Sequence, residues 1–204
     1  MKAFLIALGV VVVGIIALGA VAVSGYNSLV TKEQSVDAQW AQVQNVYQRR
    51  ADLIPNLVQT VSGAANFEKS TLVEVTNARA SVGRLTINAS KAPATAAQLQ
   101  AFDQAQGQLS SALSRLMVVS ERYPQLTATA NFRDLQAQLE GTENRIAVER
   151  RRFNEAVLSY DASIKTVPAV FFAAALGFKE KPYFAAAPTA QTPPQVKFDF
   201  SDKK

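Results

Sequence analysis

Carboxylates are the groups in this sequence that are best placed to do chemistry. Glu140, Glu143 and Glu149 follow one another at short intervals in a segment with helical periodicity. Paired carboxylates can act as general acid and general base in a reaction. No other part of the sequence indicates a pocket for a substrate, so ion pairs on a helical surface explain these residues better. We therefore expect no catalytic residue and no enzymatic activity.

The chain has 204 residues and contains neither histidine nor cysteine, which excludes most other kinds of site. A nucleophile paired with histidine cannot be built. The usual nitrogen and sulfur ligands of zinc are missing, as is the histidine of the di-iron sites found in some helical bundles. The sequence predicts no cofactor and no metal ion, and carboxylate chemistry or a serine–lysine pair is what remains.

Three consecutive arginines at positions 150–152 form a basic cluster. Successive residues of a helix point about 100° apart, so the three side chains cannot form one flat phosphate-binding face. Glu149 and Glu155 lie within pairing distance on the same helix. The net charge of +5 is spread along the chain. We therefore expect ion pairs here and no binding of nucleic acid.

The N-terminal segment is apolar enough to cross a membrane. Residues 3–23 carry no charge, and the next charged residue is Lys32. At about 1.5 Å per residue this run covers about 30 Å, the thickness of a bilayer core. The alternative is a cleaved signal peptide that begins at Lys2, but such peptides have apolar cores of only about 7–15 residues. We expect residues 1–25 to be an uncleaved anchor in the lipid bilayer.

The orientation of this anchor depends on the basic residues that flank it. Lys2 on one side is nearly balanced by Lys32 on the other, so the positive-inside rule gives almost a tie. We expect a single-pass protein of the cell membrane whose following domain lies on the outer, periplasmic side.

Beyond the anchor, apolar residues recur at helical spacing in four stretches. Gly63, the segment NASKAP at 88–93 and the pair Tyr123-Pro124 separate them, and Thr95 with Gln98 matches a capping box. Short connections between amphipathic helices predict an all-α, antiparallel up-and-down bundle of four helices over residues 26–184. The alternative is three helices, the first running unbroken past Gly63. The stripes are Val36, Trp40, Val43, Tyr47, Ile54, Leu57 and Val61; Leu72, Val75, Ala78, Val82 and Leu85; Leu99, Phe102, Leu109, Leu113, Leu116 and Tyr123; and Phe132, Leu135, Leu139, Thr142, Ile146, Phe153 and Tyr160.

A proline lies inside the first of these helices, in the segment QRRADLIPNLV at residues 48–58. Pro55 has no N–H, so the carbonyl of Ala51 loses its usual helical partner. The apolar stripe keeps its phase across the proline, which favours a kink over a break in the chain. A short break, with Asp52 capping the restart, is the alternative.

Arg50 falls on the apolar stripe of the same segment, where an unpaired charge costs several kcal/mol. If the first and fourth helices are antiparallel neighbours with level membrane ends, Arg50 lies opposite about residue 141. Glu143 borders the fourth stripe and is therefore the predicted partner in a structural ion pair, with Glu149 as the second candidate. The alternative is that Arg50 extends along its stem to solvent.

Long motifs of this chain resemble those of the LemA family. They are YNSLV at residues 26–30, Trp40, QRRADLIPNLV, YPQL at 123–126, NFRDLQAQLEGTENRIAVERRRFNEAV at 131–157 and LGFKEKPYF at 176–184. Phe153 stands where that family usually has tyrosine. The resemblance implies a membrane-anchored helical bundle. It implies no activity, because the biochemical function of the family is not established.

The apolar segment 169–184 follows the fourth helix, which should return to the membrane. It is either a strap packed on the bundle or a contact with the bilayer interface through Phe171, Phe172 and Phe178. Residues 185–204 are rich in Pro, Ala, Thr and Gln, which is typical of a flexible tail.

These features together predict a scaffold or interaction protein of the bacterial envelope. Its expected partners are the bilayer, through residues 3–23, and another envelope protein, while oligomerisation is left open. A carboxylate-only enzyme and a lipid-sensing domain that works through residues 169–184 are the alternatives.

Overall fold

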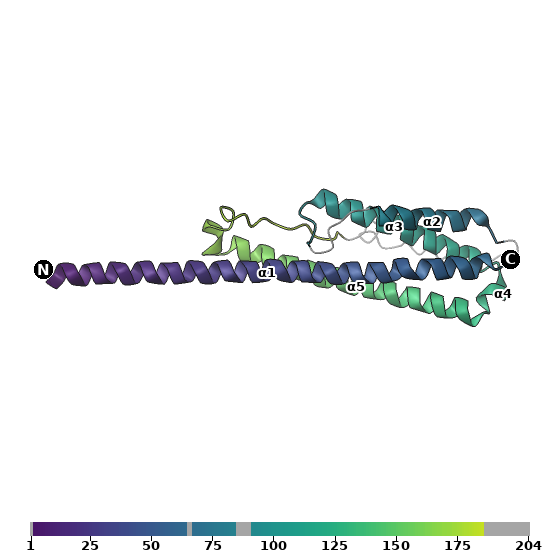
Figure 1. Cartoon of the computed structure of the whole chain (residues 1–204), viewed down its shortest axis with the longest axis horizontal. Helices are drawn as coiled ribbons and strands as arrows, with labels where there is room; N and C mark the ends of the chain where they lie inside the picture. Colours follow the sequence, from purple (N-terminus) through teal and green to yellow (C-terminus); the bar gives the residue numbers. More distant parts are fainter. Residues whose placement is uncertain (1, 65–66, 85–90, 186–204) are drawn as a thin grey trace, which may run out of the picture.

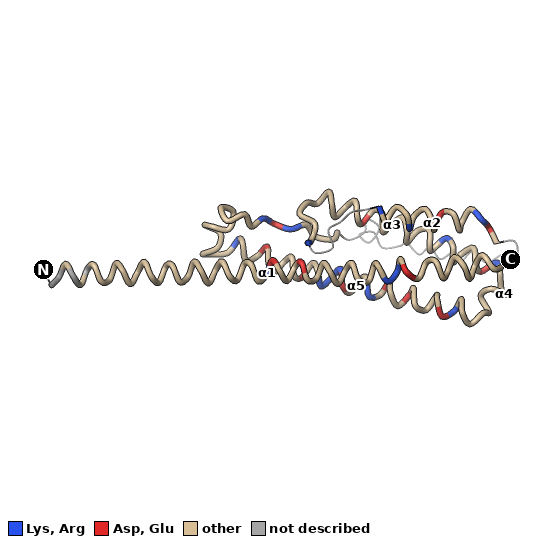
Figure 2. Tube along the Cα trace, in the orientation of Figure 1, with Lys and Arg blue, Asp and Glu red and all other residues tan. Residues whose placement is uncertain are grey.

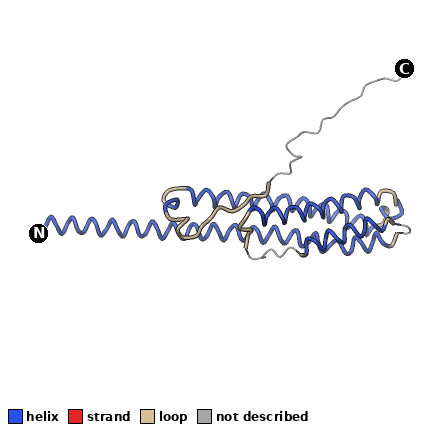
Figure 3. The backbone as a smooth tube through the Cα atoms, turned by 90° about the horizontal axis from the view of Figure 1, so that it is seen from above, coloured by secondary structure: helices blue, strands red, loops and turns tan. Residues whose placement is uncertain are grey.

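The computed structural model describes residues 2–64, 67–84 and 91–185 of the chain. All regular structure in this part is helical, which confirms the predicted fold class (Figure 3). The predicted tail therefore lies outside the described residues beyond Ala185. The elements are α1 (Lys2–Ser62), α2 (Lys69–Gly83), α3 (Ala96–Ser120), α4 (Pro124–Thr127), α5 (Ala130–Lys165) and the 3-10 turn η1 (Ala169–Phe171).

Helix α1 joins the apolar N-terminal segment to the bundle without interruption. It contains 61 residues, which corresponds to about 90 Å. The described side chains of residues 4–23 are exposed, and the first buried side chain is that of Leu29. Figure 1 shows this part of α1 projecting from one end of the bundle. The boundary predicted at residue 25 thus falls inside a helix, at the point where packing begins.

The four principal helices alternate in direction. The chain leaves the projecting end along α1, returns along α2, leaves again along α3 and returns along α5, as Figure 1 shows. Helix α5 packs along α1, and α2 packs along α3. The predicted four helices are confirmed over the three-helix alternative, because α1 ends at Ser62 and the next helix, α2, begins at Lys69.

Local signals in the sequence account for the helix ends. Thr95 and Gln98 form the predicted capping box, which satisfies free N–H groups at the start of α3. The side chain of Thr129 caps α5 by accepting from the backbone N–H of Phe132. Pro124 occupies the first turn of α4, where its missing N–H has no cost.

The core consists of two apolar clusters stacked along the bundle. The proximal cluster, nearer the projecting end of α1, is built around Trp40, whose ring lies 5.2 Å from that of Phe102 and 5.6 Å from that of Phe153. The distal cluster contains Leu57, Leu116 and other residues of the four helices and α4. On each of α1, α3 and α5 the two clusters are separated by one turn that carries polar side chains.

After η1, residues 172–185, here called the strap, run back along the bundle (Figure 1). Asn154 of α5 clamps the end of the strap, since its amide accepts from the N–H of Phe184 and donates to the carbonyl of the same residue, both at 2.9 Å. Asp161 accepts from the N–H of Lys181 at 3.1 Å. The Phe184 ring is inserted beside Trp40 at 6.2 Å, so the strap completes the proximal cluster.

Candidate functional site

The polar turn between the two clusters is centred on Arg50, which is only 1% exposed. Its Nη1 donates to Glu143 Oε1 at 2.7 Å and to Ser110 Oγ at 2.8 Å. Its Nη2 donates to both the side-chain and backbone carbonyl oxygens of Gln106. The structure therefore brings the two residues of the expected ion pair together, with α3 contributing further acceptors. We call Arg50, Gln106, Ser110 and Glu143 the polar layer.

The partners from α3 were missed in the sequence, although one of them left a signal. Gln106 is four residues after Phe102 and three before Leu109, so it occupies the apolar phase of its helix. A buried polar residue at such a position requires a partner. Gln106 is 4% exposed, and its side chain faces Arg50 from α3.

Pro55 lies on the exposed side of α1, and the helix continues through it. The alternative of a short break at this point is therefore excluded, while the predicted kink stays a prediction. The carbonyl of Ala51, which Pro55 deprives of its helical donor, accepts from Nε of Arg79 at 3.0 Å. Arg79 belongs to α2, so the proline leaves an acceptor on α1 that a neighbouring helix uses.

Each of the three carboxylates considered for chemistry binds a different side chain. Glu140 accepts from Gln136 on its own helix, Glu143 pairs with Arg50, and Glu149 pairs with Arg152 at 2.9 Å. Across residues 2–64, 67–84 and 91–185, no group of three acidic side chains could hold a metal ion. Glu140 and Glu143 do line one open pocket of about 500 Å³ between α3 and α5, but Gln136 and Arg50 already occupy an oxygen of each carboxylate.

The arginine cluster is ion-paired as predicted. Arg151 pairs with Glu155 at 3.9 Å, and Arg152 with Glu149. Arg150 points elsewhere: it pairs with Asp103 of α3 at 2.9 Å, and its guanidinium lies 4.3 Å from the centre of the Phe184 ring. The three side chains therefore fan around α5 and do not form one anion-binding face.

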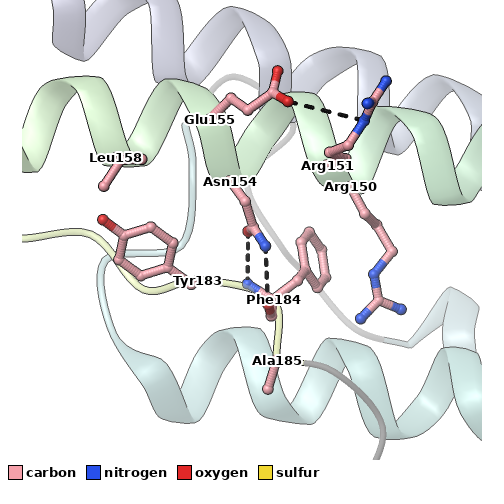
Figure 4. A pocket seen from close by; sticks show the side chains of 8 residues that line it. All are labelled: Arg150, Arg151, Asn154, Glu155, Leu158, Tyr183, Phe184 and Ala185. Carbon is pink, nitrogen blue, oxygen red and sulfur yellow. Dashed lines mark hydrogen bonds and ion pairs between the residues drawn. The ribbon is translucent and has the colours of Figure 1, made fainter. Parts of the chain in front are cut away.

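An open pocket of about 480 Å³ lies where the strap crosses α5. Figure 4 shows Asn154 directed at the backbone of Phe184 and Arg151 directed at Glu155. Leu158 and Tyr183 form its apolar side. Most of the polar groups around it are already used by one another, so the pocket is best explained as the seam of the strap clamp.

Two buried tyrosines of the proximal cluster have perturbed ionisation. Burial raises the pKa of Tyr160 to about 12, and the charges of Glu33 and Asp161 act in the same direction. Burial also raises the pKa of Tyr47, although the nearby guanidinium groups of Arg150 and Arg50 oppose it. Both hydroxyls are protonated at neutral pH, which suits packing better than proton transfer.

The apolar residues after α5 are divided between the core and the surface. Phe178 is 8% exposed and packs against Tyr26 with ring centres 5.8 Å apart, so its predicted contact with lipid is wrong. Phe172 is half-buried against the proximal cluster. Phe171 is 80% exposed. The segment is thus a strap packed on the bundle at Phe178, and an exposed apolar surface at Phe171.

The projecting part of α1 is the other exposed apolar surface. It is the one helix of the described chain that is long and apolar enough to cross a membrane, and it lies near the N-terminus. Figure 2 shows that charged residues lie in the part of α1 that packs in the bundle and in the rest of the chain, while the projecting part of α1 is uncharged from residue 3 onward. Nothing in the described chain covers this surface.

Comparison with known proteins agrees with this architecture. The model of the LemA family matches residues 39–198. The chain is 27% identical over 211 residues to the magnetosome protein MamQ of Magnetospirillum gryphiswaldense. The aligned region covers 93% of this chain and 76% of that protein. It is 28% identical over 201 residues to the magnetosome protein MamQ 1 of Paramagnetospirillum magneticum, with 89% and 72% covered.

The family match and the exposed apolar part of α1 support a membrane-associated protein of the LemA type. The match covers most of the chain, from the middle of α1 to beyond the strap. The chain belongs to the LemA family.

Proposed function

We propose that this chain is a single-pass, non-enzymatic scaffold that holds a partner protein at a set distance from the membrane. Residues 1–25 are the anchor, and residues 26–184 fold as one unit upon it. The buried polar layer and the ion-paired arginines then have structural roles within that unit. Residues 26–184 produced alone should give a strongly helical circular dichroism spectrum and a cooperative melt.

The observation that carries this proposal is the continuity of α1, which runs from Lys2 to Ser62. A flexible linker between anchor and domain would let the domain move freely. Here the same helix crosses the bilayer and forms the longest element of the bundle. From residue 26 to its end α1 covers about 55 Å, so the far end of the bundle is held at about that height.

Site-specific photo-crosslinking of the full chain in its membrane tests the proposal. Val73, Val118 and Val148 are exposed apolar side chains on α2, α3 and α5, and they are suitable sites for the crosslinker. A scaffold should give a discrete crosslinked partner from at least one of them. The absence of any adduct at all three sites would contradict the proposal.

The role of the distance is tested by inserting a short flexible Gly–Ser linker after Gly25. The inserted chain should remain in the membrane fraction and keep its helical content, but lose the crosslink. The matched control replaces residues 3–23 with an unrelated apolar span and keeps the junction, and it should retain the crosslink.

We further propose that the bundle lies on the outer side of the cell membrane. Lys2 borders the apolar run directly, whereas Lys32 is nine residues beyond Val23, which favours an inside N-terminus. A single cysteine placed at the exposed Gln125 of α4 should react with a membrane-impermeant maleimide in spheroplasts. Reaction only after lysis would reverse the orientation.

A further inference from the structure

A neutral, exposed apolar surface lies at the end of the bundle from which the anchor projects. It consists of Val167, Val170, Phe171 and Leu176, which are 74%, 46%, 80% and 52% exposed. We call these four residues the collar. Residues 166–178 carry no charge, so the collar is not interrupted by side chains that would favour water.

The collar is fixed to α1 at the point where the apolar run ends. A Cβ added to Gly25 would lie 3.0 Å from the tip of the Phe172 ring, so the strap touches α1 two residues beyond Val23. Tyr26 contacts Phe178 in the next turn of the strap. Two residues of α1 correspond to about 3 Å, so the collar lies at the level where the hydrocarbon core of the bilayer ends.

Two buried alanines between the collar residues fix the turn to the bundle. Ala169 and Ala173 are 7% and 3% exposed and belong to the proximal cluster. They lie on either side of the exposed Val170 and Phe171 in the sequence, so one face of the turn packs on the bundle and the other is left uncovered. The backbone of the turn is thus held by its alanines while Phe171 stays 80% exposed.

We infer that the collar inserts into the headgroup region of the same bilayer that α1 crosses. This rests on the proposed anchor, since it is the anchor that brings the collar to the lipid surface. Short apolar surfaces at such a depth bury their side chains about 5–10 Å into the interface. Tyr26 is 43% exposed at the same level, and tyrosine is enriched where membrane and water meet.

The charges beside the collar indicate which lipids it needs. Lys165 pairs with Glu180 at 2.8 Å and Lys181 pairs with Glu33 at 2.9 Å. These two basic groups are therefore neutralised within the protein, and the exposed Lys179 is left as a single charge beside the collar. The collar should insert into a zwitterionic bilayer and gain little from anionic lipid, because the attraction is to the apolar phase.

The absence of cysteine from the chain allows a direct measurement of depth. Phe171→Cys of the full chain is labelled with the polarity-sensitive dye NBD and reconstituted into phosphatidylcholine vesicles. Leu158→Cys is the matched control, because Leu158 is also apolar and 61% exposed but lies seven residues before the end of α5. Val21→Cys reports on the anchor itself.

If the collar inserts, lipids with a nitroxide near the headgroup should quench dye at residue 171 at least about twofold more than dye at residue 158. The emission at residue 171 should also be blue-shifted. Adding phosphatidylglycerol should leave both results unchanged. Circular dichroism should match the unlabelled chain, because Phe171 is mostly exposed and its replacement removes little packing.

Three results would overturn the inference. Equal quenching at residues 171 and 158, with residue 21 quenched, would refute the collar and leave the anchor intact. Protection of residue 171 from both lipid and aqueous quenchers would show that a second copy of the chain covers it. Loss of quenching at residue 21 as well would refute the anchor, and the collar with it.

Discussion

Removing either partner of the Arg50–Glu143 pair should destabilise the bundle, and the two changes should not add. We consider a cycle of Arg50→Ala, Glu143→Ala and the double variant in residues 26–204. In Arg50→Ala the bundle loses a fully buried side chain together with its hydrogen bonds to α3 and α5. The cavity left by the side chain and the buried Gln106 left without its donor should together cost about 3–5 kcal/mol.

The expected cost of Glu143→Ala is smaller, because the Glu143 side chain is 45% exposed. The guanidinium of Arg50 stays buried and keeps its acceptors on Gln106 and Ser110. What it loses is one hydrogen bond to a charged group, worth about 1.5–3 kcal/mol when buried. Solvent screening at the exposed carboxylate reduces this to about 1–2 kcal/mol.

In the Arg50→Ala background Glu143 has no buried charge to neutralise and is a half-exposed surface group. Its removal should then cost almost nothing. The coupling free energy should therefore be close to the whole cost of Glu143→Ala in the parent, about 1–2 kcal/mol, which lies within the range for residues in contact. It should fall in high salt, because one partner is open to solvent.

Urea unfolding followed by circular dichroism measures all four free energies of unfolding. A parallel cycle with Arg49→Ala in place of Arg50→Ala is the matched control, since Arg49 is the exposed neighbour on α1. Additivity of the Arg50 and Glu143 effects within about 0.5 kcal/mol would refute the reasoning. The pair would then be a contact without energetic consequence, and other interactions would set the register of α1 and α5.

Three further predictions follow from other contacts. Arg79→Ala should cost about 1 kcal/mol in the parent and clearly less with Pro55→Ala, because alanine gives the Ala51 carbonyl back its helical donor; equal costs in urea unfolding would contradict this. Asn154→Ala should lose two strap hydrogen bonds worth about 1 kcal/mol each and speed amide exchange at Phe184, whereas unchanged exchange would show that ring packing alone holds the strap. The raised pKa of Tyr160 means that the folded chain keeps a proton that the unfolded chain loses above pH 10.0, so stability should fall as the pH rises from about 10 to about 12; Tyr160→Phe should fall less steeply over that interval, and identical slopes would refute the assignment.

Much of the architecture could be predicted because helical periodicity and short turns leave few arrangements. The register of α1 against α5 illustrates this. Level membrane ends place Arg50 opposite about residue 141, and the observed partner is Glu143, while Lys32 donates to Ser159 further along the same pair. Both pairs have nearly the same sum of residue numbers, as antiparallel helices require.

The contacts that could not be predicted depend on the position of a third element. The choice of Gln106 and Ser110 as acceptors for Arg50 depends on how α3 is rotated and shifted against α1. The contact of Arg79 with Ala51 depends in the same way on α2. Neither quantity is fixed by the apolar period of one helix, because side-chain packing sets it.

The strap shows a different limit of sequence reasoning. Its composition indicated contact with something apolar, but not which residues would face the bundle. Asn154 and Asp161 decide this by hydrogen-bonding the strap backbone at residues 184 and 181. Such contacts join segments far apart in the sequence and have no local periodicity.

In the proposed topology, the unbroken α1 makes the anchor and the bundle a single lever. Membrane-spanning helices tilt by about 20° on average, and more when their apolar run exceeds the thickness of the bilayer. Over the length of about 55 Å beyond the membrane, such a tilt carries the far end of the bundle sideways by about 19 Å. A change in bilayer thickness would thus appear as a lateral displacement at α4, and a collar on one side of the pivot would set the direction of the swing.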